Sequence, residues 1–381
     1  MFERAVVLGL FVAAIAATHA EEIALSDFKL GGYYKNLLVR SETVIPPREP
    51  YTLDLNRLRL EVKGRPSESI AFDLQYDNEI LLGSYLQTSQ FAIEKERPPE
   101  QYWKAEANYA EGGDYYGRHR LYRANVTLTA GATDMRIGRQ RIAWGTGRFW
   151  SPLDLLNPFS PIAIEREERV GVDAVLIEHK LGALSRVGAV YAPRHDRGES
   201  SAALLWHHNI AGIDYSIVGG RFRRENVAGL DVATQISDAG IRGELTYTER
   251  DDAPAHWRAV AALDYAFANT LTLSGELYYN GAGATDPRAY DFPALLAGRI
   301  QNVARRYFGG YAAYEITPLV EWRNYVVINL ADDSWYFSPA LIYSAKANVD
   351  LTLGVQWFRG RSGSEYALFP DLYFAALQWF F

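Results

Sequence analysis

The sequence contains no cysteine, which excludes disulfide bridges, thiolate metal sites, a cysteine nucleophile and covalently attached c-type haem. It also lacks an excess of positive charge. Its 39 basic and 46 acidic residues give a formal charge of −7, which argues against a nucleic-acid partner. No stretch after residue 20 approaches the run of about 18 apolar residues that a transmembrane helix needs. With 22% charged residues and a mean hydropathy of −0.17, the chain is too polar for a bundle of such helices.

Aromatic residues are abundant by contrast, with 25 Tyr, 17 Phe and 9 Trp among 381 residues. A soluble chain of this length would usually form two or three domains of roughly 150 residues each. Middling hydropathy, many tyrosines and the absence of cysteine together favour an outer-membrane barrel over a cytosolic enzyme.

The first 20 residues are predicted to be a cleaved signal peptide. Met1 to Arg4 form a short charged start, residues 5–17 form an apolar run of 13 residues, and Ala20 stands at the expected cleavage point. Thirteen apolar residues are too few to span a bilayer, which needs about 20. Residues 21–381 are therefore expected to form the mature protein as a single barrel domain.

Beyond residue 20, apolar and polar residues alternate in many segments, which is typical of strands with one apolar face. In one such segment Ile70, Phe72, Leu74 and Tyr76 alternate with Ala71, Asp73, Gln75 and Asp77. A soluble sandwich or propeller also has alternating strands. The segments here run longer than the roughly 5–6 residues usual in soluble sheets, and aromatic residues gather near their ends. We therefore predict an all-β, antiparallel transmembrane barrel.

The connections between these segments predict about 18 strands. Eight short turns alternate with nine longer connections along the sequence, and both termini then fall on the short-turn side, which we expect to be periplasmic. The weakest strand is 230–236, and losing it with a neighbour would give 16 strands. The longest loops, 82–117 and 144–169, are expected to be extracellular, and short helices are considered over 91–97 and 102–107.

The last residues carry a second export-related pattern, in which every second residue is apolar and the final one is aromatic. The stripe resembles the closing strand of Gram-negative outer-membrane proteins, whose terminal aromatic residue is recognised during barrel assembly. The resemblance implies location in the outer membrane of a Gram-negative bacterium, with its lipid and the barrel-assembly machinery as partners. The expected assembly signal comprises Tyr373, Leu377, Trp379 and Phe381.

A barrel of 16 to 18 strands encloses an aqueous lumen. Alternation places a nearly balanced set of seven basic and eight acidic residues on its wall, so no strong ion selectivity is inferred. These residues could equally be cross-strand pairs that stabilise the sheet. The lumen-wall candidates are Arg59, Asp73, Arg242, Glu244, Arg258, Asp264, Glu276, Glu321 and Arg323.

The most unusual segment is 136–158, where four arginines fall within 13 positions and a loop rich in Gly, Pro and aromatic residues follows. It leads into the third long loop, which resembles the inward-folded third loop of general porins. Strict alternation would place Arg139 on the face of Ile137, so either Gly138 forms a bulge or the strand top projects above the bilayer. The constriction candidates are Arg136, Arg139, Arg141, Arg148, Asp154, Glu165 and Arg166.

The same segment resembles a motif of outer-membrane porin-like families of unknown function and, more loosely, of the alginate-export type. The matching residues are Gly138 to Gln140, Trp144-Gly145 and the turn from Phe149 to Pro158. The resemblance implies a porin-like barrel and leaves the substrate open.

These observations predict a passive channel for small hydrophilic solutes or for an exported oligosaccharide. A second interpretation is a sleeve around a partner such as a multihaem cytochrome, and a homo-oligomer is a further possibility. A barrel hydrolase is disfavoured because the six mature histidines lack zinc-binding spacing and no G-x-S-x-G motif occurs. We expect no catalytic activity, metal or cofactor.

Overall fold

The computed structural model describes residues 28–97, 101–166, 169–251, 253–296 and 299–381. The predicted signal peptide, residues 1–20, lies outside these ranges. The strands are β1 (Phe28–Glu42), β2 (Pro50–Ser67), β3 (Ile70–Leu82), β4 (Glu106–Glu111), β5 (Tyr115–Ala130), β6 (Thr133–Gln140), β7 (Val172–Gly182), β8 (Ser185–Ala192), β9 (Ser201–Ile210), β10 (Ile213–Phe222), β11 (Glu225–Ile236), β12 (Ala239–Arg250), β13 (His256–Ala266), β14 (Thr272–Asn280), β15 (Arg306–Thr317), β16 (Val320–Asn329), β17 (Trp335–Lys346), β18 (Val349–Arg359) and β19 (Leu372–Phe380). Short helices in the loops are η2 (Ser84–Gln87), α2 (Ser89–Lys95), η3 (Arg197–Glu199), η4 (Pro287–Ala289), α3 (Phe292–Leu296) and η5 (Tyr366–Leu368).

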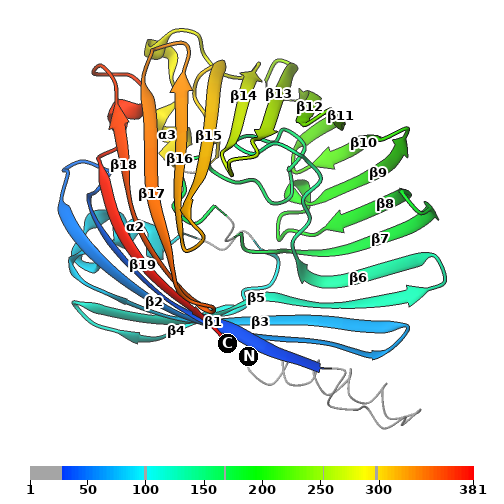
Figure 1. Cartoon of the computed structure of the whole chain (residues 1–381), viewed down its shortest axis with the longest axis horizontal. Helices are drawn as coiled ribbons and strands as arrows, with labels where there is room; N and C mark the ends of the chain where they lie inside the picture. The colour runs from blue at the N-terminus through cyan, green and yellow to red at the C-terminus, as the bar shows by residue number, and fades with distance from the viewer. Residues whose placement is uncertain (1–27, 98–100, 167–168, 252, 297–298) are drawn as a thin grey trace.

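The strands form one antiparallel sheet that closes on itself, because β1 pairs with both β2 and β19 (Figure 1). Closure pairs the first wall strand with the last, so that the sheet has no terminal edge strands. In the described part of the chain the closed wall contains 18 strands, which confirms the predicted barrel and strand number. None of the helices there is long and apolar enough to cross a membrane.

Strand β4 is an additional short strand. It pairs with the upper part of β5, where Asn108 lies opposite Arg118, beyond the point at which the short strand β6 ends. The helix considered over 102–107 is therefore wrong, because part of this segment is recruited to the edge of β5. The helix considered over 91–97 corresponds in part to α2, which begins at Ser89.

Alternation along the strands separates an apolar outer face from a polar inner face. On β2, Arg57 and Arg59 are each 4% exposed and point inward, whereas Leu58 and Leu60 are about two-fifths exposed on the outside. The C-terminal stripe also faces outward, with Tyr373, Trp379 and Phe381 among the exposed aromatic residues. Its recognition by the assembly machinery stays a prediction.

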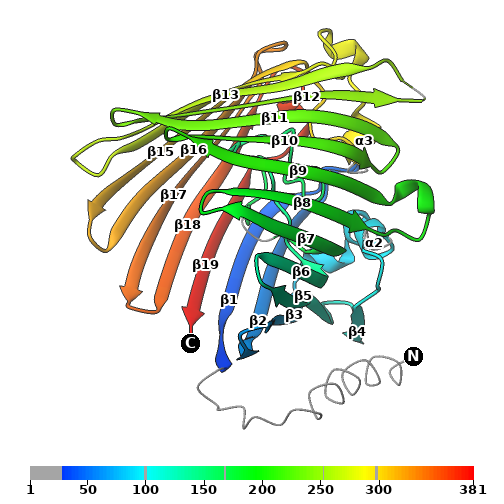
Figure 2. The same cartoon turned by 90° about the vertical axis from the view of Figure 1, so that its right-hand side faces the viewer.

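Short turns lie at one end of the barrel and most of the longer connections at the other (Figure 2). Strands β10 and β11 are joined by a tight turn of two residues, Arg223 and Arg224, and Arg223 adopts a positive φ of 56°. The weakest predicted strand is part of β11, which is longer than expected because the hairpin continues to residue 225.

The loop that follows β6, described over residues 141–166 and 169–171, passes through the interior of the barrel (Figure 1). Its Leu153 and Leu156 pack with residues such as Leu176 and Val218 on the inner face of β7 to β11. Phe149 and Trp150 pack in a second cluster, which includes Tyr278, Tyr307 and Tyr336 on β14, β15 and β17. The apolar core of this protein is therefore the contact between one loop and the barrel wall.

Candidate functional site

The inner loop 141–171 is held on the wall by Glu276, a buried residue of β14. The Glu276 carboxylate accepts hydrogen bonds from three consecutive backbone N–H groups, those of Arg148 (2.8 Å), Phe149 (3.1 Å) and Trp150 (2.8 Å). Hydrogen bonds to a carboxylate are stronger than those between neutral groups. One wall side chain therefore fixes the loop at the position where its aromatic residues enter the wall.

Glu244 on β12 holds the adjacent part of the loop in the same way. Its carboxylate accepts from the backbone N–H groups of Thr146 and Gly147, each at 2.6 Å, from that of Leu153 at 3.1 Å, and from the Ser151 hydroxyl. The loop wraps so tightly here that a Cβ at Gly147 would lie 1.7 Å from the Trp150 carbonyl oxygen. The sequence placed both glutamates on the lumen wall but gave no sign of this anchoring role.

A third wall contact involves Arg242, also on β12. Its guanidinium forms a two-bond ion pair with Asp264 on β13, at 2.7 and 2.9 Å, and also donates to the Thr146 carbonyl oxygen. Backbone donors of the loop therefore meet carboxylates, and a backbone acceptor meets an arginine. The charged residues of this wall are complementary to the loop.

The aromatic residues of the loop fit into spaces left by small wall residues. Phe149 and Trp150 are almost completely buried, and the Trp150 ring stacks on Tyr278 with 5.2 Å between centroids. A Cβ at Gly309 on β15 would lie 2.6 Å from the Phe149 ring. The absence of a side chain at Gly309 therefore provides the space for Phe149.

Two of the predicted constriction arginines each lie over the ring of a wall tyrosine, and the two tyrosine rings lie beside each other. The Arg148 Cζ lies 4.4 Å from the centroid of the Tyr311 ring, and the Arg166 Cζ lies 3.5 Å from that of Tyr325. The two tyrosine rings are 4.9 Å apart, and Arg166 also donates to the Tyr336 hydroxyl at 3.1 Å. The sequence did not single out these tyrosines. Alternation along β15 and β16 predicts which face of the barrel wall a side chain occupies, but it does not predict which loop residue the side chain contacts.

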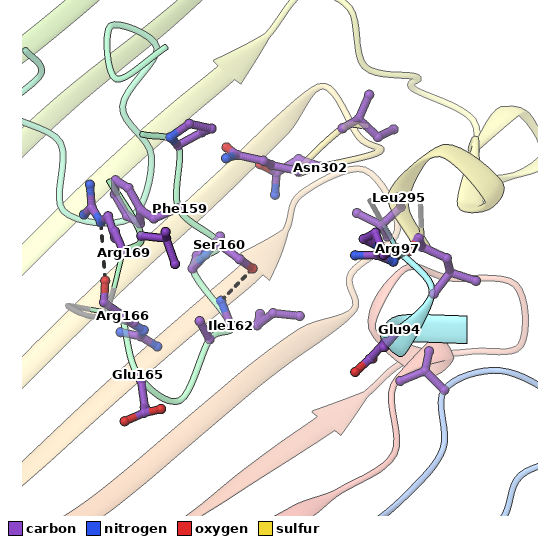
Figure 3. A pocket seen from close by; sticks show the side chains of 18 of the residues that line it. Glu94, Arg97, Phe159, Ser160, Ile162, Glu165, Arg166, Arg169, Leu295 and Asn302 are labelled. Carbon is purple, nitrogen blue, oxygen red and sulfur yellow. Dashed lines mark hydrogen bonds between the residues drawn. The ribbon is translucent and has the colours of Figure 1, made fainter. Parts of the chain in front are cut away.

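The far end of the loop reaches the first strands through Glu165. Its carboxylate pairs with Lys35 on β1 at 2.8 Å and with Arg57 on β2 at 2.9 Å. Burial would raise the pKa of Glu165, but the two cations outweigh burial and lower it below its usual range. Figure 3 shows Glu165 projecting from the loop beside Arg166.

The wall behind Glu165 carries more cations than carboxylates. Arg57 and Arg118 both contact Glu79, and Arg59 forms a two-bond pair with Asp77. Five cations, Lys35, Arg57, Arg59, Arg118 and Arg120, face three carboxylates, Asp77, Glu79 and Glu165, so this group has a net charge of +2.

Asp154 and Arg169 close the base of the loop with a 2.5 Å ion pair. Burial raises the pKa of Asp154 to about 7 despite this cation. The Arg169 carbonyl oxygen accepts from Arg123 on β5 at 2.6 Å. The middle of the loop is thus joined to its C-terminal end, and that end is joined to the wall.

Arg139 lies apart from the other constriction candidates. Gly138 has a φ of +117°, but the pairing of β6 with β5 continues through it without a shift, so Arg139 stays on the outward face of Ile137. There it is buried, bonded to Asp173 at 2.8 Å and to the Trp103 carbonyl oxygen. Arg139 therefore faces away from the lumen, and residues of the long loop bury it there.

The remaining candidates occupy separate positions. Arg136 lies on β6 and donates to Thr127 at 3.3 Å, Arg141 is exposed at the start of the loop, and Asp73 accepts from Gln75. Glu321 and Arg323 pair with each other on β16. Arg258 lies on β13, on the same face as the buried Val260.

Above the loop lies a cavity of about 1070 Å³ (Figure 3). Its lining combines apolar residues such as Ile93, Phe159 and Leu295 with the cations Arg97, Arg166, Arg169 and Arg194 and the carboxylates Glu94, Glu165 and Glu365. Arg97 donates to the Leu296 carbonyl oxygen at 3.2 Å, so the loops carrying α2 and α3 meet at its rim. Residues of the inner loop, such as Phe159 and Glu165, therefore form part of the wall of this cavity.

His207 and Ser216 do not form a catalytic triad with Asp214. His207 Nδ1 lies 3.0 Å from the Ser216 hydroxyl, but its Nε2 is 3.9 Å from Asp214, too far for the hydrogen bond that would orient a catalytic histidine. Among the residues that the structure describes, no group of three or more His, Cys, Asp or Glu could hold a metal ion.

Neither a protein-family model nor a curated protein sequence matches the chain. Solved structures do match in fold. Pseudomonas aeruginosa OpdK, solved with vanillate, is 10% identical over 94% of this chain and 99% of its own, with a TM-score of 0.61. Acinetobacter baumannii OccAB1 is 10% identical over 95% and 98%, with a TM-score of 0.58. Pseudomonas aeruginosa OccK2 (OpdF), in complex with glucuronate, is 12% identical over 93% and 96%, with a TM-score of 0.57.

The chain has the fold of an outer-membrane porin. The similarity spans nearly the whole barrel, and at this level of identity it concerns the fold alone. The narrower resemblance to barrels of unknown function or of the alginate-export type is not confirmed by these comparisons.

Proposed function

We propose that this protein is an outer-membrane channel through which small hydrophilic solutes diffuse, with a preference for anions. The observation that carries the proposal is the inner loop 141–171, which Glu244 and Glu276 fix inside a barrel wide enough for an aqueous lumen. A loop bonded at this many points narrows the passage and presents fixed charges to the solute.

The anion preference rests on the charges beside this loop. The group of five cations and three carboxylates described above, which combines side chains of β1, β2, β3 and β5 with Glu165 of the loop, has a net charge of +2. In the part of the chain that the structure describes, no carboxylate forms an ion pair with Arg141, Arg148 or Arg166. A narrow site lined by an excess of one charge concentrates ions of the opposite sign. Two neighbours in fold were solved with carboxylates, vanillate and glucuronate, which supports the same direction.

The other interpretations have less support. A sleeve around a folded cytochrome needs an open lumen, whereas the inner loop occupies this one. No specific observation favours oligosaccharide export or hydrolysis.

The purified protein in a planar bilayer tests this function. With a KCl gradient across the bilayer, we expect stepwise ohmic currents whose reversal potential lies on the chloride side of zero. A chain that inserts and carries no current would contradict the channel, and a reversal potential on the potassium side would contradict the anion preference.

A further inference from the structure

A cluster of polar side chains lies on the outer face of the barrel, where lipid is expected. Asn36 on β1 and Asn56 on β2 both donate to Asp54 Oδ1, at 2.6 and 2.9 Å. The Tyr34 hydroxyl donates to Asn56 at 2.5 Å. Four side chains of two neighbouring strands thus form one hydrogen-bonded group around a carboxylate.

The register places this group on the outside. Asn36 lies opposite Asn56, and the next residue of β2, Arg57, points inward to Glu165 of the inner loop. The outward neighbours along each strand are Leu38, which is 47% exposed, and Leu58, which is 38% exposed. The polar cluster therefore interrupts an apolar surface.

Lipid tails offer no hydrogen-bond partners, so a carboxylate on this face is costly unless protein covers it. The neighbouring strand β3 shows such a cover. Its outward Asn78 accepts from the Tyr109 hydroxyl of β4 at 3.0 Å. Strand β4 pairs with β5, and among the described residues no strand pairing joins it to β1 or β2.

A groove of about 810 Å³ borders the cluster on the same outer face. Exposed apolar residues of β16 to β19 line it, among them Trp322, Leu353 and Tyr373, and Arg40 and Asp54 lie at its β1–β2 side. Among the residues that the structure describes, no carboxylate pairs with Arg40. The face therefore combines a hollow with one cation and one carboxylate.

We propose that a second copy of this chain covers this face, related by a two-fold axis along the membrane normal. Arg40 of each copy then faces Asp54 of the other, and Asn36 and Asn56 lie within the contact. A two-fold contact requires a surface that is complementary to itself, and this face carries both charges and both hydrogen-bond donors and acceptors. Lipid tails would fill the groove and offer no opposite charge to Arg40 or to the Asp54 carboxylate, whose partners Asn36 and Asn56 are neutral.

A first experiment uses disulfide formation, which is unambiguous here because the natural chain has no cysteine. Leu38→Cys lies in the groove, and Leu204→Cys is the matched control, an outward leucine on β9 that is 66% exposed. Under oxidation in native outer membranes, we expect Leu38→Cys to form a covalent dimer and Leu204→Cys to stay monomeric. A monomeric Leu38→Cys, or equal dimer formation by both variants, would overturn the proposal.

A second experiment exchanges the charges between two differently tagged copies. We expect Arg40→Asp copies to lose mutual capture at least tenfold, and Asp54→Arg copies likewise, because each pairing opposes like charges. A mixed pair of the two variants regains capture, because opposite charges meet again at both contacts. Heat-dependent mobility in gel electrophoresis verifies that each variant is folded. Wild-type copies that do not capture each other, or a mixed pair no better than the matched pairs, would refute the two-fold contact.

Discussion

The carboxylate of Glu276 lies 2.8 Å from the backbone nitrogen of Trp150, 126 residues earlier in the chain. This contact joins the barrel wall to the inner loop at the residue whose ring is 2% exposed and stacks on Tyr278. Glu276 thereby determines where the loop crosses the lumen, and the first prediction concerns it.

Glu276→Gln is expected to lower the free energy of unfolding by about 1–3 kcal/mol, because the amide brings its own N–H group against three buried backbone donors. Urea titration of the protein in lipid vesicles measures the change. Glu321→Gln is the matched control, since Glu321 is part of a partly exposed pair with Arg323 and should change stability by less than about 1 kcal/mol. Equal losses in both variants would contradict the anchoring role.

Gly147→Ala is expected to displace the inner loop, because the new Cβ would lie 1.7 Å from a backbone oxygen that cannot move alone. Local strain of this kind costs about 1–3 kcal/mol. Gly219→Ala on β10 meets no atom within 4 Å and serves as the control. The thermal unfolding midpoints of the two variants are compared, and we expect that of Gly147→Ala to be lower. A midpoint of Gly147→Ala at or above that of the control would contradict the claim that the loop leaves no room for a Cβ at residue 147.

Arg139 and Arg148 are expected to behave differently. Arg139→Ala leaves Asp173 buried without its cation, which typically costs about 3–5 kcal/mol, but should leave the ion selectivity of the folded channel unchanged. Arg148→Ala removes an exposed cation above Tyr311 and should shift the reversal potential toward potassium with a small effect on stability. Reversal potentials of both variants under one salt gradient test this, and the opposite assignment would refute the placement of the two arginines.

A rise in pH from about 4.5 to 8 is expected to loosen the loops around Glu365. This residue of the β18–β19 connection is 2% exposed, accepts from Tyr307 and Asn329, and has a pKa that burial raises to about 8. The folded protein therefore retains a proton that the unfolded chain releases near 4.5, so stability falls as pH rises from about 4.5 to 8, by at most about 1.4 kcal/mol per unit.

Thermal unfolding midpoints of the wild type and of Glu365→Gln at pH 5, 6.5 and 8 test this expectation. The neutral amide should flatten the dependence over this range. Identical slopes in the two proteins would show that another group is responsible.

The barrel was predictable because membrane strands leave a strong local pattern, as in the alternation of Ile70 to Asp77 and in the terminal stripe that ends at Phe381. The site was predictable only in part. The segment 136–158 was recognised from its composition, whereas the anchors of the inner loop lie 91 to 128 residues away, on Glu244 and Glu276. Both glutamates fit the alternation of ordinary wall residues, and nothing local distinguishes them.

The errors have a common physical cause. Residues 106–111 form β4 because the early end of β6 leaves the upper part of β5 without a neighbour, and this vacancy is a tertiary feature. Strict alternation would expose Arg139 to lipid unless a bulge turned it inward. Arg139 instead stays on the outer face, where the segment at Trp103 covers it. In both cases a distant part of the chain determines the outcome.

The most direct test of the account is the single-channel conductance of Glu244→Gln/Glu276→Gln beside that of the wild type. If the inner loop narrows the lumen and these two carboxylates hold it there, the double variant carries a larger and more fluctuating current than the wild type. An unchanged, steady conductance in a correctly folded double variant would contradict the claim that the anchored loop is the constriction of this channel.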